Sequence, residues 1–334
     1  MQPTVSVIIP AYNAAEFIGA AIESVLSQEV HADEILVIDD GSTDNTASIV
    51  RAYGGPVRYI GQANGGPARA RNRGLVESRG HYVAFLDADD LWSADKLRRQ
   101  VGFMERHPEI GFCFADCMEF DAVGRASRSF LQSKTVFPNL PVDVTDSGGT
   151  IIVGKFYEEL LFENFIVTST VVIRGGAWPR DRWFHETVYF DETLYNGQDF
   201  ELWFRLATHF RGGVIPEVLV RKRRHPANIS TRSQSVLINR IKLRAKITHL
   251  VQEREDISAS AKKRCRDRLL FAHADLVRWY LANGDVERGR RASVEGLKVG
   301  VRLDLLVAWL LSQMGTRTSR WFLKVYRFGK AWER

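Results

Sequence analysis

Short apolar runs alternate with helical patterns over the first 90 residues, and this alternation limits the fold more than any other feature of the chain. Four runs have the length and β-branched composition of buried strands, and they cover residues 5–9, 34–38, 57–61 and 82–86. Helical patterns separate them, over about 15–28, from near 44, and over 67–78. This order predicts an α/β fold with a mostly parallel central sheet and helices on both faces.

The rest of the chain divides into three stretches. Periodicity fades over about residues 121–150, where Pro, Gly, Ser and Asp accumulate, and this indicates a long loop or lid. Helical patterns then return at 155–162 and 198–209, and strand patterns at 166–173 and 213–221. Beyond Ser230 the pattern is almost entirely helical, with a turn at Asn283-Gly284. We therefore expect one domain over residues 1–230 and a helical region over 231–334.

Charge is divided unevenly between these two parts. Residues 231–334 hold 23 Lys and Arg against 10 Asp and Glu, whereas residues 1–230 hold 23 against 30. Hydrophobic residues make up 45% of the chain and charged residues 26%, which is typical of globular proteins and argues against disorder, collagen-like and coiled-coil architectures. The basic carboxyl-terminal region predicts an anionic surface as its partner.

Cysteine content, the start of the chain and the length of its apolar runs indicate the cellular compartment. The three cysteines, Cys113, Cys117 and Cys265, are too few for a disulfide framework and lack zinc-ligand spacing. The start of the chain has no signal-peptide pattern, and no run reaches the roughly 18 apolar residues of a membrane span. We expect a cytoplasmic protein.

Acidic residues follow two of the predicted strands. Asp39 and Asp40 end the second strand, and Asp87-Ala88-Asp89 ends the fourth. Ligands of α/β sheets bind at the carboxyl ends of strands, and residues i and i+2 of an extended chain point the same way. Two carboxylates on one side suit Mg²⁺ or Mn²⁺. The alternative is a polar turn that caps a helix near Ser93, and these residues alone favour neither interpretation.

Six segments, in this order, give the chain a recognisable pattern: VSVIIPAYN (5–13), EILVIDDGSTDNT (34–46), NGGPARARNRG (64–74), YVAFLDADD (82–90), FDETLYNGQDFELWFRL (190–206) and RRHPANIS (223–230). The pattern resembles family 2 glycosyltransferases over about residues 4–230. The resemblance implies the nucleotide-sugar-binding fold called GT-A, inverting chemistry and usually a divalent metal. Within it, residues 1–115 would bind the nucleotide sugar and residues 150–230 would form the acceptor side.

The resemblance also implies roles for individual residues on the donor side. The nucleotide sugar would contact Pro10, Ala11, Tyr12, Asn13, Asp39, Asp40, Arg71, Asp87 and Arg223. Asp89 and His225 would hold Mn²⁺ or Mg²⁺, Asp87 could add a third ligand, and Asp90 would support them. Some of these residues also have a purely structural interpretation. Residues 10–13 could form a turn, Asp40 could cap a helix, and the side chains of Arg71 and His225 could be solvated.

On the acceptor side the resemblance makes Asp199 the general base that takes the proton of the acceptor hydroxyl group. Its alternative is a favourable charge at the start of a helix. A glutamate usually precedes this aspartate, whereas this chain has Gln198, so an acceptor contact through a carboxylate there is in doubt. Glu201 and Trp203 would belong to the same helix and to the acceptor wall.

The implied activity is transfer of a sugar to a carbohydrate or lipid-linked acceptor, in cell-surface polysaccharide or glycolipid synthesis. A dinucleotide-dependent oxidoreductase is the enzymatic alternative, but residues 10–13 are no Gly-x-Gly-x-x-Gly loop. The non-enzymatic alternative is a nucleic-acid-binding protein that uses the basic region. This region lacks a recognised binding motif, so we expect no nucleic acid partner.

The last twenty residues, 315–334, form a basic amphipathic helical pattern. At about 100° per residue, one face holds Trp321, Phe322, Val325, Tyr326, Phe328 and Trp332, and the opposite side holds Arg320, Lys324, Arg327, Lys330 and Arg334. Such a helix lies in the plane of a membrane surface. We expect peripheral binding to the inner face of the plasma membrane. The alternative is that this face packs on the catalytic domain or on a second subunit, so the chain could form a homodimer.

Overall fold

The computed structural model describes residues 3–121, 123–140, 142–144, 150–152, 156–175, 189–225 and 234–313. The chain divides into two compact units, Met1–Asn228 and Ile229–Arg334. Each unit is described by itself below.

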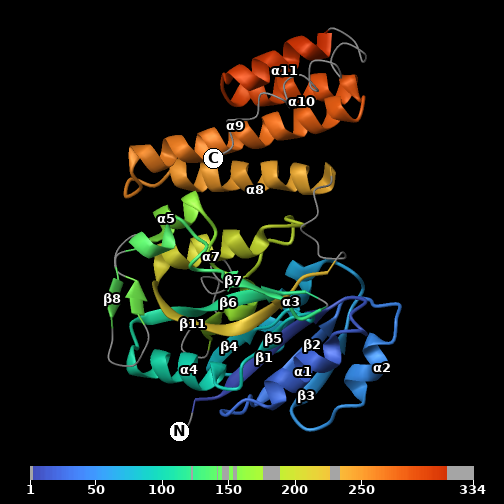
Figure 1. Ribbon diagram of the computed structural model, residues 1–334, viewed down its shortest axis with the longest axis vertical. Coiled ribbons are helices and arrows are strands. Elements are labelled where there is room, and N and C mark those ends of the chain that lie inside the picture. Colours follow the sequence, from blue (N-terminus) through green and yellow to red (C-terminus); the bar gives the residue numbers. More distant parts are fainter. Residues whose placement is uncertain are drawn as a thin grey trace. The chain divides into compact units, whose positions relative to one another are not determined.

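The first unit begins with the alternation that the sequence predicts (Figure 1). Its elements are β1 (Val5–Ala11), α1 (Ile18–Leu26), β2 (Glu34–Asp39), α2 (Thr46–Arg51), β3 (Val57–Gly61), α3 (Pro67–Glu77) and β4 (Tyr82–Phe85). Strands β1, β2 and β4 are almost wholly buried, in keeping with their continuous apolar sequences. Helix α2 begins later than expected, because Asp44 accepts a hydrogen bond from the amide of Thr46 and holds a turn before the helix.

The remaining elements of this unit are more irregular. They are β5 (Leu91–Trp92), α4 (Lys96–Arg106), β6 (Ile110–Phe120), β7 (Ala126–Ser129), a 3₁₀ turn η1 (Phe137–Asn139), β8 (Val142–Val144), β9 (Thr150–Ile152), α5 (Phe156–Phe162), a second 3₁₀ turn η2 (Thr168–Thr170), β10 (Val172–Arg174), α7 (Gln198–His209) and β11 (Arg211–Arg223). Two expectations need correction. The strand predicted over 166–173 is a 3₁₀ turn followed by the short β10, and the stretch 121–150 contains β7, η1 and β8 among its described residues.

The strands form one mixed sheet in the described part of the chain, with the order β3-β2-β1-β4-β10-β6-β11-β9-β8. Pairing is parallel from β3 to β4 and between β6 and β11. Strand β10 pairs antiparallel with both β4 and β6. The expected α/β fold is confirmed. Parallel pairing joins the four amino-terminal strands and the pair β6–β11, whereas the other pairings of the sheet are antiparallel. Those four strands bring the ends of β1, β2 and β4 to one edge, where the acidic residues lie.

Helices cover both faces of the sheet (Figure 1). On one face Val5, Val7 and Ile9 of β1 pack in a core with apolar residues of α1, α2 and α4. On the other face α3 lies so close to β1 that a Cβ atom at Gly74 would be 2.4 Å from Cγ2 of Ile8. Helix α7 packs on the same side, with Trp203 next to Phe85.

The second unit is helical, with α8 (Gln234–Gln252), α9 (Ala259–Ala282), α10 (Val286–Val299) and α11 (Leu303–Gln313). Ser258 and Asp285 cap α9 and α10 by accepting hydrogen bonds from backbone amides. The expected turn at Asn283-Gly284 is present, and Gly284 has a φ of 82° there. None of the described helices is both long and apolar enough to cross a membrane.

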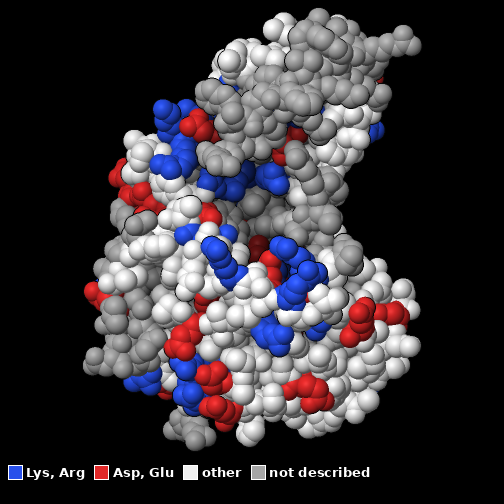
Figure 2. Space-filling model, viewed as in Figure 1, with Lys and Arg blue, Asp and Glu red and all other residues white. Residues whose placement is uncertain are grey.

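Basic side chains dominate this unit, as the sequence predicts. Residues 234–313 hold sixteen Lys and Arg against nine Asp and Glu, and several basic groups are visible on the face drawn in Figure 2. The amphipathic segment 315–334 lies outside the described residues.

Candidate active site

Asp39 and Asp40 organise the edge of the sheet at the end of β2. Asp39 is 2% exposed and accepts hydrogen bonds from the amide of Ser42 and from the hydroxyl group of Tyr59, at 2.9 and 2.8 Å. Asp40 is 3% exposed and accepts from the side chain of Gln62 and from the amides of Gly65 and Gly66. Asp40 therefore fixes the loop that leads into α3 and does not cap α2.

The segment Pro10 to Asn13 leaves β1 next to these aspartates. Pro10 and Ala11 are the last residues of the strand, and the carbonyl of Ala11 accepts a hydrogen bond from the amide of Asp40. Asn13 has a φ of 47°, and its side-chain oxygen accepts from the amide of Thr43 at 2.8 Å. Tyr12 is 54% exposed. The segment is a turn bonded to the end of β2, with one aromatic ring presented to solvent.

The carboxylates after β4 converge with basic groups from distant parts of the chain. An oxygen of Asp89 lies 2.8 Å from Nε2 of His225. Asp87 forms an ion pair of 2.7 Å with Arg71 of α3. The side chain of Arg223, near the end of β11, donates to the carbonyl of Asp89 at 3.1 Å. The structure thus brings together the five residues that the sequence proposed for the phosphates and the metal.

Asp90 and Ser169 are buried next to this cluster and are hydrogen-bonded to its backbone. Asp90, 1% exposed, accepts hydrogen bonds from the hydroxyl group of Ser169 at 2.6 Å and from the amide of Arg223 at 3.0 Å. Ser169 also accepts from the amide of Asp87, and its carbonyl accepts from the indole of Trp92. The 3₁₀ turn η2 places Ser169 here. No sequence motif points to Ser169, because its neighbours resemble a strand.

Negative charge is concentrated at this point. Burial, and then repulsion by Asp87, raises the pKa of Asp89, and the nearby His225 opposes this only in part. Burial and the neighbouring carboxylates of Asp89 and Asp87 raise the pKa of Asp90 well above its usual value. A cation bound beside Asp87 and Asp89 would relieve this repulsion.

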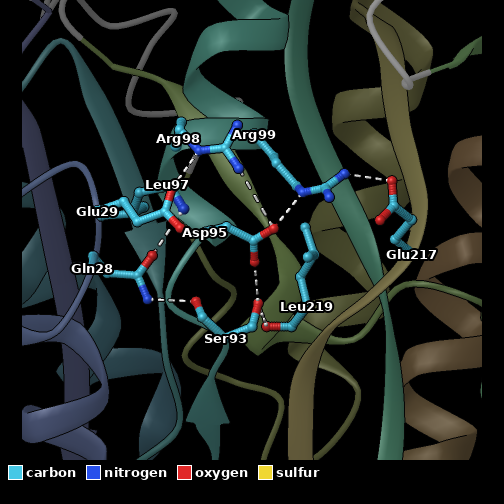
Figure 3. Close-up of polar contacts among 9 residues, drawn as sticks. All are labelled: Gln28, Glu29, Ser93, Asp95, Leu97, Arg98, Arg99, Glu217 and Leu219. Carbon is cyan, nitrogen blue, oxygen red and sulfur yellow. Dashed lines mark hydrogen bonds and ion pairs between the residues drawn. The ribbon is translucent and has the colours of Figure 1, made fainter.

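A polar network anchors the chain just after the acidic segment (Figure 3). The side chain of Gln28 donates to the carbonyl of Ser93 at 2.6 Å and accepts from the amide of Leu97 at 2.9 Å. The guanidinium group of Arg99 bridges Asp95 and Glu217, and so ties α4 to β11. Helix α4 follows Asp95, and Asp87 and Asp89 contact Arg71 and His225, so the alternative in which Asp87 and Asp89 cap this helix is wrong.

Arg71 is almost wholly buried, although it is a charged residue. Its Nη2 atom contacts Asp87, and its guanidinium carbon lies 5.3 Å from the ring centroid of Phe190. Its Nε and Nη1 atoms are buried and have no hydrogen-bond partner among the described residues. The neighbouring Asn72 exchanges two hydrogen bonds with the backbone of Phe190. Asn72 and Phe190 lie in the motifs at 64–74 and 190–206, which gave them no role of their own, and they connect α3 to the segment that leads into α7.

Asp199 lies in the first turn of α7 and is partly exposed. One carboxylate oxygen accepts from the amide of Phe200 at 2.7 Å, and the other accepts from the hydroxyl group of Thr168 at 3.4 Å. The second bond is long, so this oxygen remains able to accept a proton from another group.

The other residues predicted for the acceptor side are buried. Gln198 is 6% exposed, and both Glu201 and Trp203 are 0% exposed. The carboxylate of Glu201 is held by Arg205 through two contacts of 2.8 Å. In this conformation Glu201 and Trp203 do not line a surface that an acceptor could contact. They pack α7 against the sheet and thereby position Asp199.

The chemistry of the donor set fits a divalent metal. Asp87 and Asp89 offer carboxylate oxygens and His225 an imidazole nitrogen, all of which Mn²⁺ accepts. Within the described residues no group of three or more His, Cys, Asp and Glu side chains is arranged to hold a metal ion. The hydrogen bond between His225 and Asp89 occupies atoms that a metal would need.

Comparison with known proteins identifies the family. The family model of glycosyl transferase family 2 matches residues 6–205. The chain belongs to glycosyl transferase family 2. Membership of this family favours a glycosyltransferase over the two alternatives from the sequence, an oxidoreductase and a nucleic-acid-binding protein.

Relatives of this chain come from several bacteria. An uncharacterized glycosyltransferase of Rickettsia felis is 28% identical over 67% of this chain and 34% of its own length. One of Rickettsia prowazekii is 30% identical over 68% of this chain and 65% of its own. The putative teichuronic acid biosynthesis glycosyltransferase TuaG of Bacillus subtilis is 44% identical over 31% of this chain and 42% of its own. The chain thus spans from about a third to just under two thirds of these relatives.

Solved structures with the same fold include S. aureus TarS. Residues 1–349 of TarS superpose with a TM-score of 0.58 and 18% identity, covering 99% of this chain and 93% of that one. A TarS structure in complex with UDP-GlcNAc gives a TM-score of 0.59 at 17% identity. At such identity the likeness shows the fold alone, and it confirms the GT-A fold with helices at the carboxyl terminus.

Proposed function

We propose that this glycosyltransferase moves a sugar from a nucleotide-sugar donor to an acceptor hydroxyl group, with inversion at the anomeric carbon. The observation that carries the proposal is the meeting of Asp87, Asp89, Arg71, Arg223 and His225 at the carboxyl end of β4. Nucleotide sugars carry a diphosphate, and this cluster combines basic groups with a carboxylate pair suited to a divalent cation. The solved TarS structures in complex with UDP and UDP-GlcNAc support this class of donor.

Mn²⁺ or Mg²⁺ would be held by Asp89 and His225, with Asp87 as a third ligand. Both Asp89 and His225 would have to exchange their mutual hydrogen bond for the cation. When bound, such a cation would stabilise the charge that develops on the diphosphate leaving group. The ion pair with Arg71 would keep the carboxylate of Asp87 in place, and the contact with the Asp89 carbonyl would keep Arg223 beside the phosphates.

On the donor side, Asp39, Asp40 and the turn from Pro10 to Asn13 would enclose the nucleoside. Both aspartates are buried and already accept hydrogen bonds from the chain, so they would shape the nucleoside site through the loops that they hold. Asp199 would take the proton of the acceptor hydroxyl group as that oxygen attacks the anomeric carbon. Gln198 is buried beside it and leaves Asp199 without a second acidic residue at this position.

We propose cell-surface polysaccharide or glycolipid synthesis as the setting. The similarity to a putative teichuronic acid biosynthesis glycosyltransferase supports a polysaccharide product. The basic carboxyl-terminal region supports peripheral association with the inner face of an anionic membrane, near a lipid-linked acceptor.

A thermal-shift panel tests the proposed donor class. We expect a nucleoside diphosphate sugar, with UDP-sugars as the first to be tried, to raise the unfolding temperature when Mn²⁺ is present, because a ligand that binds only the folded chain stabilises it. Asp89→Ala should fold and lose the Mn²⁺-dependent part of this shift, since the residue lies at the rim of the sheet. If no nucleotide sugar shifts the wild-type transition with or without Mn²⁺, the proposed function is wrong.

A further inference from the structure

Phe17 contacts two residues of the proposed donor site, although no sequence motif singled it out. It precedes the first residue of α1 and is partly buried. Its ring stacks on the imidazole of His225, with ring centroids 4.9 Å apart and an interplanar angle of 29°. The guanidinium carbon of Arg223 lies 5.2 Å from the centroid of the same ring. Phe17 therefore joins the amino terminus of α1 to the end of β11.

Both contacts restrict the direction of a group that points at Asp89. The terminal torsion of a histidine side chain has a broad energy profile, so packing decides where its nitrogens point. Here Nε2 of His225 points at the carboxylate of Asp89, at 2.8 Å. A stacked ring restricts rotation of the imidazole away from this direction.

Arg223 is placed between two aromatic rings. Its guanidinium carbon lies 4.6 Å from the ring centroid of Phe120 as well as 5.2 Å from that of Phe17. A cation is attracted to the face of an aromatic ring, and the attraction is stronger where water is excluded. Phe120 belongs to β6, the neighbour of β11, and fixes Arg223 within the sheet. Phe17 adds the contact that comes from the donor side.

We infer that Phe17 is a positioning residue of the donor site, which holds the imidazole of His225 and the guanidinium group of Arg223 toward Asp89. The inference rests on the proposed function, because its consequence is tighter binding of a metal and a diphosphate. Residues that orient metal ligands typically change metal affinity by about 10–100-fold when they are replaced. The aromatic ring, not merely apolar volume, supplies the orientation.

Calorimetric titration of UDP in the presence of Mn²⁺, with variants of the full chain, tests this role. Phe17→Leu keeps an apolar side chain and removes the ring, whereas Phe17→Tyr keeps the ring. Phe103→Leu is a matched control, because Phe103 also packs against a histidine, His107, with centroids 4.8 Å apart, but belongs to the core of α4. Thermal unfolding of each variant is measured in parallel.

We expect Phe17→Leu to weaken the binding of UDP with Mn²⁺ by about tenfold or more, and Phe17→Tyr to bind as the wild-type chain does. Phe103→Leu should lower the unfolding temperature and leave the binding of UDP unchanged. Wild-type affinity in Phe17→Leu, or an equal loss in Phe103→Leu, would overturn the inference.

The ring protons of His225 give a second readout that does not depend on nucleotide binding. A ring stacked on an aromatic face is shielded, so these proton resonances should move downfield in Phe17→Leu and stay near their wild-type positions in Phe17→Tyr. If the wild-type chain bound no UDP, the proposed donor would be wrong and this spectrum would still test the stacking of Phe17 on His225. Unchanged His225 resonances in Phe17→Leu would show that the ring does not position the imidazole.

Discussion

Asp199 illustrates how one carboxylate can serve both a helix and a reaction. Its position in the first turn of α7 is favourable for a negative charge, by about 0.3–1 kcal/mol, so the sequence alone cannot separate the two roles. The structure gives one of its oxygens a bond of 2.7 Å to the amide of Phe200 and the other only a long contact of 3.4 Å with Thr168. One oxygen is thus used by the backbone, and the other can receive a proton.

We predict that Asp199→Asn folds and binds the donor as the wild-type chain does, yet loses transfer. Asparagine can still accept the hydrogen bond from the amide of Phe200, but it cannot take a proton from an acceptor. General-base catalysis typically contributes about 10²–10⁴-fold, so kcat should fall by that factor while the affinity for the nucleotide is retained. Turnover within about threefold of wild type would show that Asp199 serves only the helix.

Helix α4 contains a buried lysine that the proposed reaction does not use. Lys96 is 0% exposed, its Nζ atom has no hydrogen-bond partner among the described residues, and it lies 3.9 Å from the ring centroid of Trp92. Burial lowers the pKa of Lys96 to about 7. Since an unfolded lysine has a pKa near 10.4, the unfolded chain holds one more proton than the folded chain between these two values.

The free energy of unfolding should therefore rise with pH in this window, by up to about 1.4 kcal/mol per pH unit from this residue. Below about pH 7 both states are protonated, and the cost of burying the charge is constant. Lys96→Met should remove this dependence, so its advantage in stability over the wild-type chain should be largest near neutral pH and shrink toward about pH 9. Urea unfolding at both pH values measures it, and a pH-independent difference between the two proteins would contradict the assignment.

At the scale of elements, the sequence predicts the bounds of those helices and strands that local patterns determine. The range 198–209 of α7 and the range 57–61 of β3 agree with the structure, because apolar periodicity and flanking glycines mark their ends. The strand expected over 166–173 is present only from Val172, because Thr168 to Thr170 are β-branched or small residues that also fit a buried 3₁₀ turn. What decides between them is the hydrogen bond from Ser169 to Asp90, which lies 79 residues away in the sequence.

In the candidate site, too, the sequence predicts residues that belong to motifs and not those whose roles depend on contacts between elements. Motif resemblance pointed to Asp89 and His225, which are 136 residues apart and lie 2.8 Å from each other in the structure. It gave no indication of Phe17 or Ser169 and assigned no role to Asn72, which lies in the motif at 64–74, because the roles of these residues depend on contacts between elements. It also placed Glu201 and Trp203 on an acceptor wall, whereas both are buried, because a helical pattern does not tell which of two packed faces meets a ligand.

For the whole molecule, the uneven charge predicts where the enzyme acts. Residues 315–334 hold six Lys and Arg against one acidic residue, and they add an apolar face that includes Trp321 and Trp332. Each basic residue near an anionic membrane contributes about 1 kcal/mol to binding. We predict that the full chain sediments with anionic vesicles and less so in high salt, whereas a chain without residues 315–334 stays folded in the supernatant. Neutral vesicles are the control, and if both chains remain in the supernatant with anionic vesicles, the segment is a packing element and the membrane assignment fails.

The central claim is that the carboxylates after β4 bind a nucleotide diphosphate through a divalent cation, and titration of UDP into the wild-type chain tests it most directly. With Mn²⁺ present, we expect saturable binding that disappears in excess EDTA and in Asp89→Ala, while both proteins keep the same unfolding temperature without nucleotide. Equal affinity for UDP in Mn²⁺ and in excess EDTA would contradict the claim.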